Sequence, residues 1–194
     1  MYAVFPRYHL RISLLALPSF FMMLYLEGIL PTALLLLAAL LHELGHYLAI
    51  RREGAPIRRV DILPMGGLMV YDQTETSPKG CALVSAAGPM ANLFAMAVCL
   101  PFLHASPYIL FFVLANAFLA FLNLLPWEAL DGGSILFHLM LAQTDAWRAE
   151  RICKQISRVT SVFLAFLFLL LGLYSAFPLW HLLLSAMLLV TAFR

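Results

Sequence analysis

Charged residues are scarce in this sequence. Lysine, arginine, aspartate and glutamate make up 11% of its 194 residues, whereas hydrophobic residues make up 63%. A soluble domain carries about a quarter charged residues, so the composition argues against an ordinary soluble globular protein. Together with a mean hydropathy of +0.93, it predicts an all-α polytopic membrane protein embedded in the lipid bilayer.

Cysteines and clustered basic residues are also rare. The three cysteines, Cys81, Cys99 and Cys153, form no CxxC or other paired spacing. This argues against a disulfide framework and favours ordinary packing. No basic patch with interleaved aromatic residues lies outside the apolar segments, so no nucleic acid is expected as a partner. The sequence also lacks the two matching halves that many transporters carry.

Apolar runs predict six transmembrane helices in a single membrane domain over residues 1–194, with no PDZ or CBS domain. Most runs reach the about 20 residues that cross a hydrocarbon core about 30 Å thick, and the last is short. The first lacks a small-residue cleavage site, so we interpret it as a span rather than a cleaved signal peptide. The predicted spans are residues 10–27, 29–50, 81–104, 107–126, 157–176 and 178–193.

The basic residues predict the orientation of these spans. All 12 lysines and arginines fall on one side of the predicted bundle. The connections near Glu27, His104 and Phe177, on the other side, carry none. By the positive-inside rule, both termini are expected in the cytoplasm.

The second predicted span contains the run His42-Glu43-Leu44-Gly45-His46. Histidines at i and i+4 lie on one helical face, so both imidazoles can bind one metal ion. The glutamate between them is the usual general base of a zinc hydrolase. Ionisable residues are costly inside a bilayer and indicate a functional site there. We therefore predict one catalytic Zn²⁺ per chain, with His42 and His46 as ligands and Glu43 as the catalytic base.

A second polar segment runs from Asn123 to Gly133. Pro126 is expected to end or kink the fourth span, and Gly132 and Gly133 to let the chain turn after Asp131. With the predicted topology, Asp131 and the two histidines fall in the same leaflet, so we predict Asp131 as the third metal ligand. The alternative is that Asp131 is only a turn residue before two glycines.

The segment from Pro56 to Asp72 has two short alternating runs on either side of Pro64-Met65-Gly66-Gly67. This pattern predicts a small membrane-associated β-hairpin on the cytoplasmic side, with Gly66 and Gly67 supplying the positive φ of its turn. Such a hairpin offers an edge strand to an extended substrate peptide. A plain interfacial loop is the alternative.

These motifs resemble those of the site-2 protease family of intramembrane zinc metalloproteases. The run from His42 to His46 is similar to the family's metal helix. The Asn123-x-x-Pro126-x-x-x-Leu130-Asp131-Gly132 run is similar to its second signature, whose aspartate is the third zinc ligand. The resemblance implies that Asn123 binds substrate or the oxyanion; the alternative is that it pins the broken helix.

Two further segments carry the resemblance. Gly88-Pro89-x-x-Asn92 looks like the family's small-residue motif, which implies a helix-packing role for Gly88 and Asn92. The turn ending in Gly66 and Gly67 is similar to the hairpin that members place over the site, which implies that these glycines contact substrate.

Within the family, the chain looks most like the SpoIVFB (stage IV sporulation) type, apart from the missing CBS domain. This implies a hydrolase of the bacterial plasma membrane that cuts a peptide bond in or near a transmembrane or membrane-associated segment. The implied substrate is one such as a pro-sigma or anti-sigma factor, with membrane-embedded regulatory proteins as further partners. The alternatives are a membrane zinc peptidase of another substrate class, or a catalytically silent scaffold; the intact motif argues against the latter.

The remaining polar residues are assigned structural roles. Glu128 is interpreted as a solvated interfacial charge. The histidines outside the motif are interpreted as interfacial or packing residues, and among them His138 alone follows Asp131 closely enough to contact a ligand. These histidines are His9, His104, His138 and His181.

Overall fold

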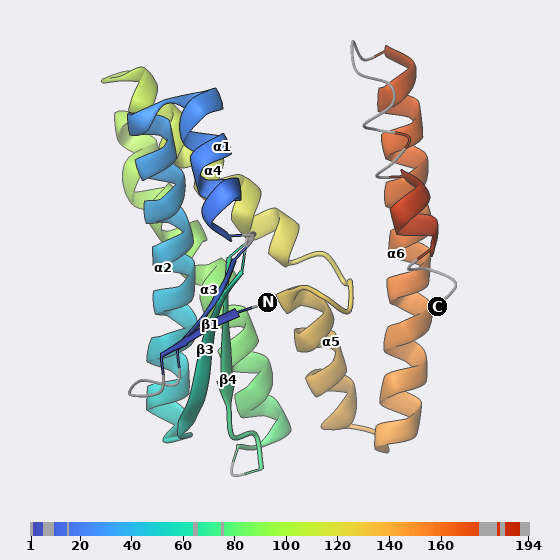
Figure 1. Cartoon of the computed structure of the whole chain (residues 1–194). Helices are drawn as coiled ribbons and strands as arrows, with labels where there is room; N and C mark the ends of the chain where they lie inside the picture. The colour runs from blue at the N-terminus through green and yellow to red at the C-terminus, as the bar shows by residue number, and fades with distance from the viewer. Residues whose placement is uncertain are drawn as a thin grey trace. The chain divides into compact units, whose positions relative to one another are not determined.

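The computed structural model describes residues 2–5, 10–14, 16–63, 66–74, 76–174, 182 and 185–190. The chain divides into two compact units, Met1–Asn123 and Leu124–Arg194, which we describe separately (Figure 1).

The first unit is built around three helices. α2 (Ile29–Glu53) packs against α3 (Pro78–Cys99) and α4 (Pro107–Asn123), and the shorter α1 (Ala16–Glu27) packs on α2. A 3₁₀ turn, η1 (Leu100–Phe102), follows α3. α2 ends at Gly54, whose φ of 76° gives the left-handed cap that favours glycine. α3 begins where the Ser77 hydroxyl accepts the N–H of Gly80.

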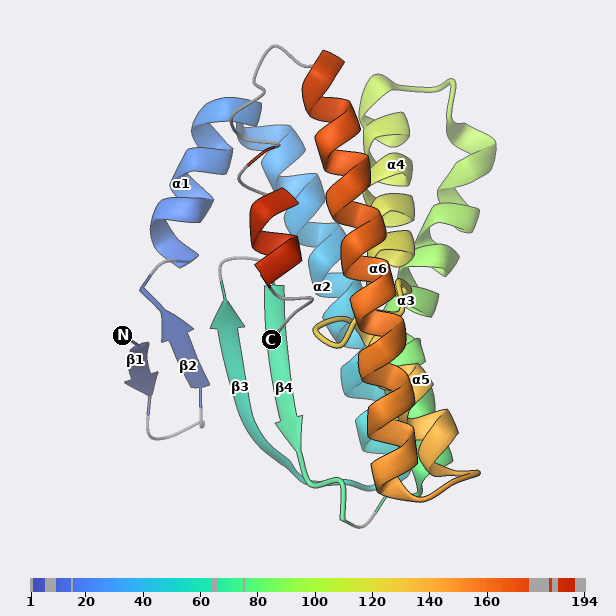
Figure 2. The same cartoon turned by 90° about the vertical axis from the view of Figure 1, so that its right-hand side faces the viewer.

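A four-stranded sheet lies beside these helices, in the order β1-β2-β3-β4 (Figure 2). β3 (Ile57–Leu63) and β4 (Gly66–Tyr71) are antiparallel, which confirms the predicted hairpin, although Pro64 and Met65 lie outside the described residues. β1 (Tyr2–Phe5) and β2 (Leu10–Ser13) extend the sheet on the β3 side. Among the strands that the structure describes, β4 therefore lies at the edge of the sheet.

A small core joins the hairpin to the helices. Ile50 of α2 and Val84 of α3 are buried, and Ile57, Met69 and Tyr71 of the hairpin pack against their cluster. Because this contact fixes the hairpin beside α2, it also fixes where β4 lies relative to the His42–His46 run.

The second unit contains α5 (Asp131–Leu141) and α6 (Ala146–Tyr174). The segment before α5 is irregular and is fastened to α6, since the N–H of Glu128 donates to the Ser157 hydroxyl at 3.1 Å. This contact holds the loop that leads to the predicted aspartate ligand at the start of α5.

Within the part of the chain that the structure describes, three helices are long and apolar enough to cross a membrane, judged by length and composition: Ile29–Glu53, Pro78–Phe102 and Ala146–Leu173. They correspond to the second, third and fifth predicted spans, and they support a mostly helical membrane protein. The count of six is not reached among the described residues. α1 and α4 have only 12 and 17 residues, and most of the predicted span 178–193 lies outside the described residues.

The start of the first predicted span differs from the structure for a physical reason. That span began at Leu10, but Leu10–Ser13 forms β2 because it pairs in parallel with Val60–Ile62. The fifth predicted span, from residue 157, falls within a longer helix that starts at Ala146, where the sequence is amphipathic rather than uniformly apolar.

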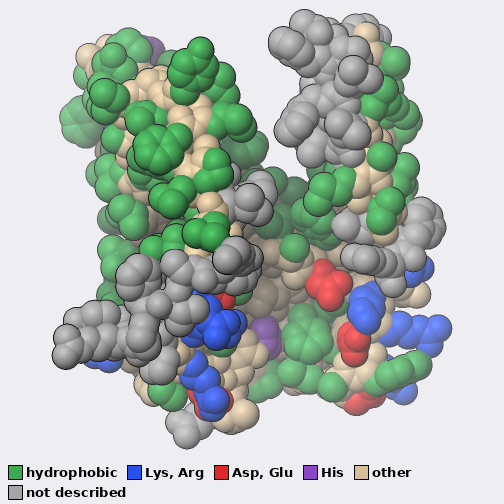
Figure 3. All heavy atoms as spheres, viewed as in Figure 1, with side chains coloured by type: hydrophobic (Ala, Val, Ile, Leu, Met, Phe, Trp, Pro, Cys, Tyr) green, Lys and Arg blue, Asp and Glu red, His purple; other side chains and the backbone are tan. Residues whose placement is uncertain are grey.

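Side chains on the surface of the first unit separate by type. Figure 3 shows hydrophobic side chains over its upper helices, whereas charged side chains gather lower down, around the sheet. Exposed apolar residues such as Leu40, Phe94 and Phe118 lie on α2, α3 and α4. An apolar belt next to a charged end is what a helical unit in a bilayer requires.

Candidate metal centre

The i, i+4 spacing on α2 brings two imidazoles together. The Nε2 atoms of His42 and His46 lie 3.1 Å apart, with His42 buried. Two nitrogens that share one tetrahedral ion at about 2.0–2.1 Å each would be about 3.3 Å apart. The two side chains are therefore already spaced as ligands of a single ion.

The other ring nitrogens determine which tautomer each histidine adopts. The Nδ1 of His46 lies 2.8 Å from the carbonyl oxygen of Val84 and must donate to it, because a carbonyl only accepts. The Nδ1 of His42 lies 2.6 Å from Oδ1 of Asn92. Each Nε2 is then left with a lone pair, which is the form that binds a metal. The donor set fits zinc.

Gly88 keeps the space between the imidazoles open. A Cβ added at Gly88 would lie 2.3 Å from Nε2 of His46 and 2.8 Å from Nε2 of His42. The close approach of α2 to α3 occurs at Gly45, where an added Cβ would lie 2.3 Å from the carbonyl oxygen of Ala87. Gly88 thus faces the candidate ligands as well as lying on a packed helix.

Glu43 points toward the hairpin. The backbone N–H of Gly67 donates to Oε1 of Glu43 at 3.2 Å. The expected positive φ is wrong for Gly67, since among the described residues only Gly28 and Gly54 have one. Gly67 instead makes room for the Glu43 carboxylate, whose Cδ would lie 2.8 Å from an added Cβ.

In the second unit, Asp131 is the first residue of α5 and is half-buried. The expectation that Gly132 and Gly133 form a turn is wrong, because both lie in the first turn of α5. An added Cβ would lie 2.3 Å from the carbonyl oxygen of Leu124 at Gly132 and 2.1 Å from that of Trp127 at Gly133. The two glycines let the preceding loop pack tightly against the helix that Asp131 opens.

Asn123 and His138 both have hydrogen-bond partners within their own helices. Nδ2 of Asn123, the last residue of α4, donates to the carbonyl oxygen of Leu119 at 3.0 Å. His138 is buried, and its Nδ1 lies 2.8 Å from the carbonyl oxygen of Ser134 in the same helix. His104 and Glu128 are exposed, whereas His9 and His181 lie outside the described residues.

Asn116 of α4 is linked to His42 through Asn92 but carries no recognisable motif. Its Oδ1 accepts from Nδ2 of Asn92 at 2.9 Å, and both asparagines are fully buried. A signal was available, since Asn116 is a polar residue in the middle of a largely apolar predicted span.

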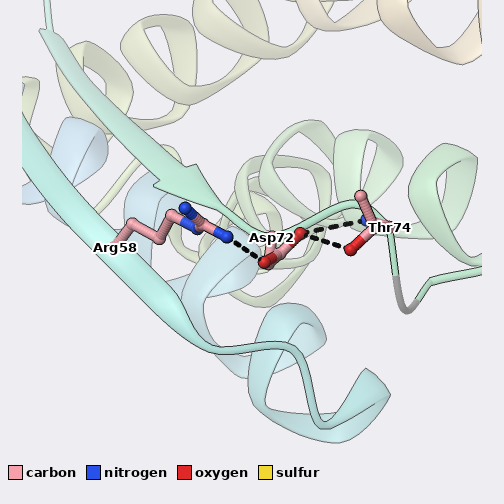
Figure 4. A network of polar contacts seen from close by, with 3 residues as sticks. All are labelled: Arg58, Asp72 and Thr74. Atoms are coloured by element: carbon pink, nitrogen blue, oxygen red, sulfur yellow. Dashed lines mark hydrogen bonds and ion pairs between the residues drawn. The ribbon is translucent and has the colours of Figure 1, made fainter.

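At the far end of the hairpin, Arg58, Asp72 and Thr74 form a polar cluster (Figure 4). The Arg58 guanidinium pairs with one oxygen of Asp72, and the N–H and hydroxyl of Thr74 donate to the other at 3.2 and 2.7 Å. The hydrogen bond from the Arg58 guanidinium, and next the hydrogen bonds from Thr74, lower the pKa of Asp72 to about 2. The cluster links β3 to the segment that follows β4.

Comparison with known proteins places these motifs in one family. The chain matches Peptidase family M50 over residues 31–108 and 101–170. The chain belongs to this family. The resemblance to site-2 proteases is thereby confirmed.

Two relatives illustrate the similarity. The zinc metalloprotease MJ0392 of Methanocaldococcus jannaschii is 29% identical over 150 residues, which cover 73% of this chain and 42% of the relative. Stage IV sporulation protein FB of Bacillus subtilis is 34% identical over 124 residues, covering 61% and 43%. The chain therefore matches about two fifths of the length of these relatives.

A solved structure shares the fold. The site-2 protease from Methanocaldococcus jannaschii superposes with a TM-score of 0.67 at 23% identity, covering 99% of this chain and 94% of the other.

Proposed function

We propose that this chain is a zinc-dependent intramembrane metalloprotease, a single membrane domain of the bacterial plasma membrane with both termini in the cytoplasm. One observation carries the proposal. The Nε2 atoms of His42 and His46 face each other at 3.1 Å, with each Nδ1 engaged by an oxygen acceptor.

We propose His42, His46 and Asp131 as the ligands of one zinc ion, as their sequence motifs predict. Two histidines and a carboxylate are a typical ligand set of zinc peptidases and leave a fourth position for water. When bound, zinc lowers the pKa of that water and polarises the scissile carbonyl.

Glu43 is the proposed general base. Its carboxylate is oriented by the N–H of Gly67, which leaves the second oxygen to take a proton from the attacking water. Glu43 then returns this proton to the departing amine. A base fixed by a backbone donor needs no rearrangement before the proton moves.

The substrate segment is proposed to add as a strand to β4. Because Gly67 donates to Glu43, its N–H points away from β3, and the N–H of Met69, two residues on, shares that orientation. A transmembrane helix must unwind before cleavage, and this edge would replace some of its backbone hydrogen bonds. Gly66 and Gly67 would contact the substrate, and Asn123 would bind the substrate or the oxyanion.

The proposed substrates are proteins with a transmembrane or membrane-associated segment. One relative is named a stage IV sporulation protein. From the family resemblance we propose regulated intramembrane proteolysis of a factor such as a pro-sigma or anti-sigma factor. Membrane-embedded regulatory proteins are proposed as further partners.

Glu43→Gln tests the assignment, because it removes the proton acceptor and keeps the size of the side chain. We expect the purified variant to retain one zinc per chain. In cells, we expect the variant to release none of the membrane-protein fragments that the wild type releases, as measured by comparing the two proteomes. Leu44→Val, at an exposed position of the same helix, should release the same fragments as the wild type. Fragment release by Glu43→Gln at the wild-type rate would contradict the role of Glu43, and a wild-type chain without zinc would contradict the whole proposal.

A further inference from the structure

Two fully buried asparagines connect helix α4 to the candidate metal centre. Asn92 of α3 and Asn116 of α4 are both 0% exposed. Burying an amide among apolar helices is costly unless each of its polar atoms finds a partner. The partners of these two side chains therefore determine how they are oriented.

The amide nitrogen of Asn92 uses both of its protons. Nδ2 donates to the carbonyl oxygen of Ala38 at 2.9 Å and to Oδ1 of Asn116 at 2.9 Å. Oδ1 of Asn92 is left facing Nδ1 of His42 at 2.6 Å. Rotating the amide by 180° would set its oxygen against two other oxygens, so the observed orientation is strongly favoured.

Asn116 is itself held in one orientation. Its Nδ2 donates to the carbonyl oxygen of Phe112 at 2.8 Å, one turn earlier in α4. Its Oδ1 must then be the atom that faces Asn92. The direction of every hydrogen bond from Phe112 to His42 follows from this arrangement.

We propose that Asn116 is a positioning residue for the zinc ligand His42, and that it acts through Asn92. By accepting from Asn92, Asn116 keeps an acceptor against Nδ1 of His42, which holds the lone pair of His42 on Nε2. Groups that orient a metal-bound histidine typically change metal affinity by about 10–100-fold. The inference rests on the proposed zinc site. It adds to that site a positioning residue, Asn116, which is not itself a ligand.

A purely structural role for Asn116 would have different consequences. Polar side chains also hold membrane helices together, and a packing contact affects the stability of the chain without a preference for acceptor or donor. The positioning role depends on an acceptor at the Oδ1 position. Asn116→Ala removes that acceptor, whereas Asn116→Asp keeps it, because a protonated carboxyl group can still donate to Phe112. Burial favours the protonated form.

The test measures zinc affinity of the purified full chain in detergent by competition with a chelator. We expect Asn116→Ala to weaken zinc binding about 10-fold and Asn116→Asp to stay within about threefold of the wild type. With Co²⁺ in place of zinc, the visible absorption should shift in the alanine variant alone. Val113→Ala, at another buried position of α4, is the control for loosened packing and should change melting temperature but not affinity.

Three outcomes would overturn the inference. Asn116→Ala could bind zinc as tightly as the wild type, Asn116→Asp could lose as much affinity as alanine, or Val113→Ala could weaken binding equally. Each of these outcomes is measured against a wild-type chain that binds zinc, so each leaves the proposed function standing. A wild-type chain that binds no zinc overturns both proposals.

Discussion

The carboxylate of Glu43 occupies the space that a side chain on Gly67 would fill. An added Cβ at Gly67 would lie 2.8 Å from Cδ of Glu43, and the Gly67 N–H donates to Oε1 at 3.2 Å. The edge strand of the sheet and the helix of the candidate base are thus in direct contact, although 24 residues separate them in the sequence. Substitutions at Gly67 should therefore act on the chemistry rather than on the fold.

We predict that Gly67→Val lowers the cleavage rate about 100-fold while zinc content stays at one per chain. The valine must displace the Glu43 carboxylate, and a shift of about 1 Å in a catalytic group costs roughly that factor. Cleavage kinetics and metal analysis of the same preparation check this. Leu68→Val, at the neighbouring exposed position of β4, should cleave at nearly the wild-type rate. If Gly67→Val cleaves at the wild-type rate, the contact between Gly67 and Glu43 does not position the base.

Two glycines on facing helices should behave differently when replaced by alanine. At Gly88 the added methyl group meets the imidazoles, so we predict a folded chain whose zinc affinity falls at least about 100-fold. At Gly45 it meets the backbone of Ala87, so we predict a lower melting temperature. Chelator competition and thermal unfolding measure the two effects. Leu83→Ala, at an exposed position of α3, should leave zinc affinity unchanged, and zinc binding at full affinity by Gly88→Ala would contradict the site.

The Asp72 cluster predicts a pH dependence at the end of the hairpin. The pKa of Asp72 in the folded chain is about 2, below the about 3.9 expected when unfolded. The stabilisation is therefore complete above about pH 4 and is lost as the pH falls toward 2. The Asp72 N–H, which donates to Pro56, should be better protected from hydrogen exchange than in Asp72→Asn at pH 7. The difference in protection between the wild type and Asp72→Asn should narrow below pH 4. A difference that does not change with pH would show that the ionised Asp72 carboxylate is not its cause.

The metal helix and the hairpin could be predicted because their residues carry periodic, local signals. His42 and His46 need only helical spacing to meet, and the hairpin needs only two alternating runs around a turn. β1 and β2 have no such signal, since Leu10–Ser13 reads as the start of an apolar helix. It becomes a strand through pairing with residues about 50 positions later, and a tertiary contact of this kind is invisible to local pattern.

The roles of several glycines could not be predicted either, because they depend on tertiary contacts. Sequence reasoning explained Gly66, Gly67, Gly132 and Gly133 by backbone freedom, because that property is intrinsic to glycine. The structure explains Gly67, Gly132 and Gly133 by what lies against them: a carboxylate in one case and loop carbonyls in the others. Asn116 was missed for a related reason, since its partner Asn92 lies on another helix.

The last prediction concerns strand addition at β4. We expect a cysteine at Leu68, whose side chain is 49% exposed on the edge strand, to crosslink to cysteines placed next to the cut site of a substrate identified through Glu43→Gln. The Glu43→Gln background keeps the substrate intact, and replacing Cys81, Cys99 and Cys153 by alanine removes competing thiols.

A cysteine at Arg58 is the matched control. Its side chain is 67% exposed, but it lies on β3, an inner strand that pairs with β4 and, over Val60–Ile62, with β2. A substrate paired with β4 should react with position 68 in an alternating pattern along its sequence, because successive side chains of a strand point to opposite faces. Equal crosslinking from both positions, or no periodicity along the substrate, would show that the extended segment binds elsewhere.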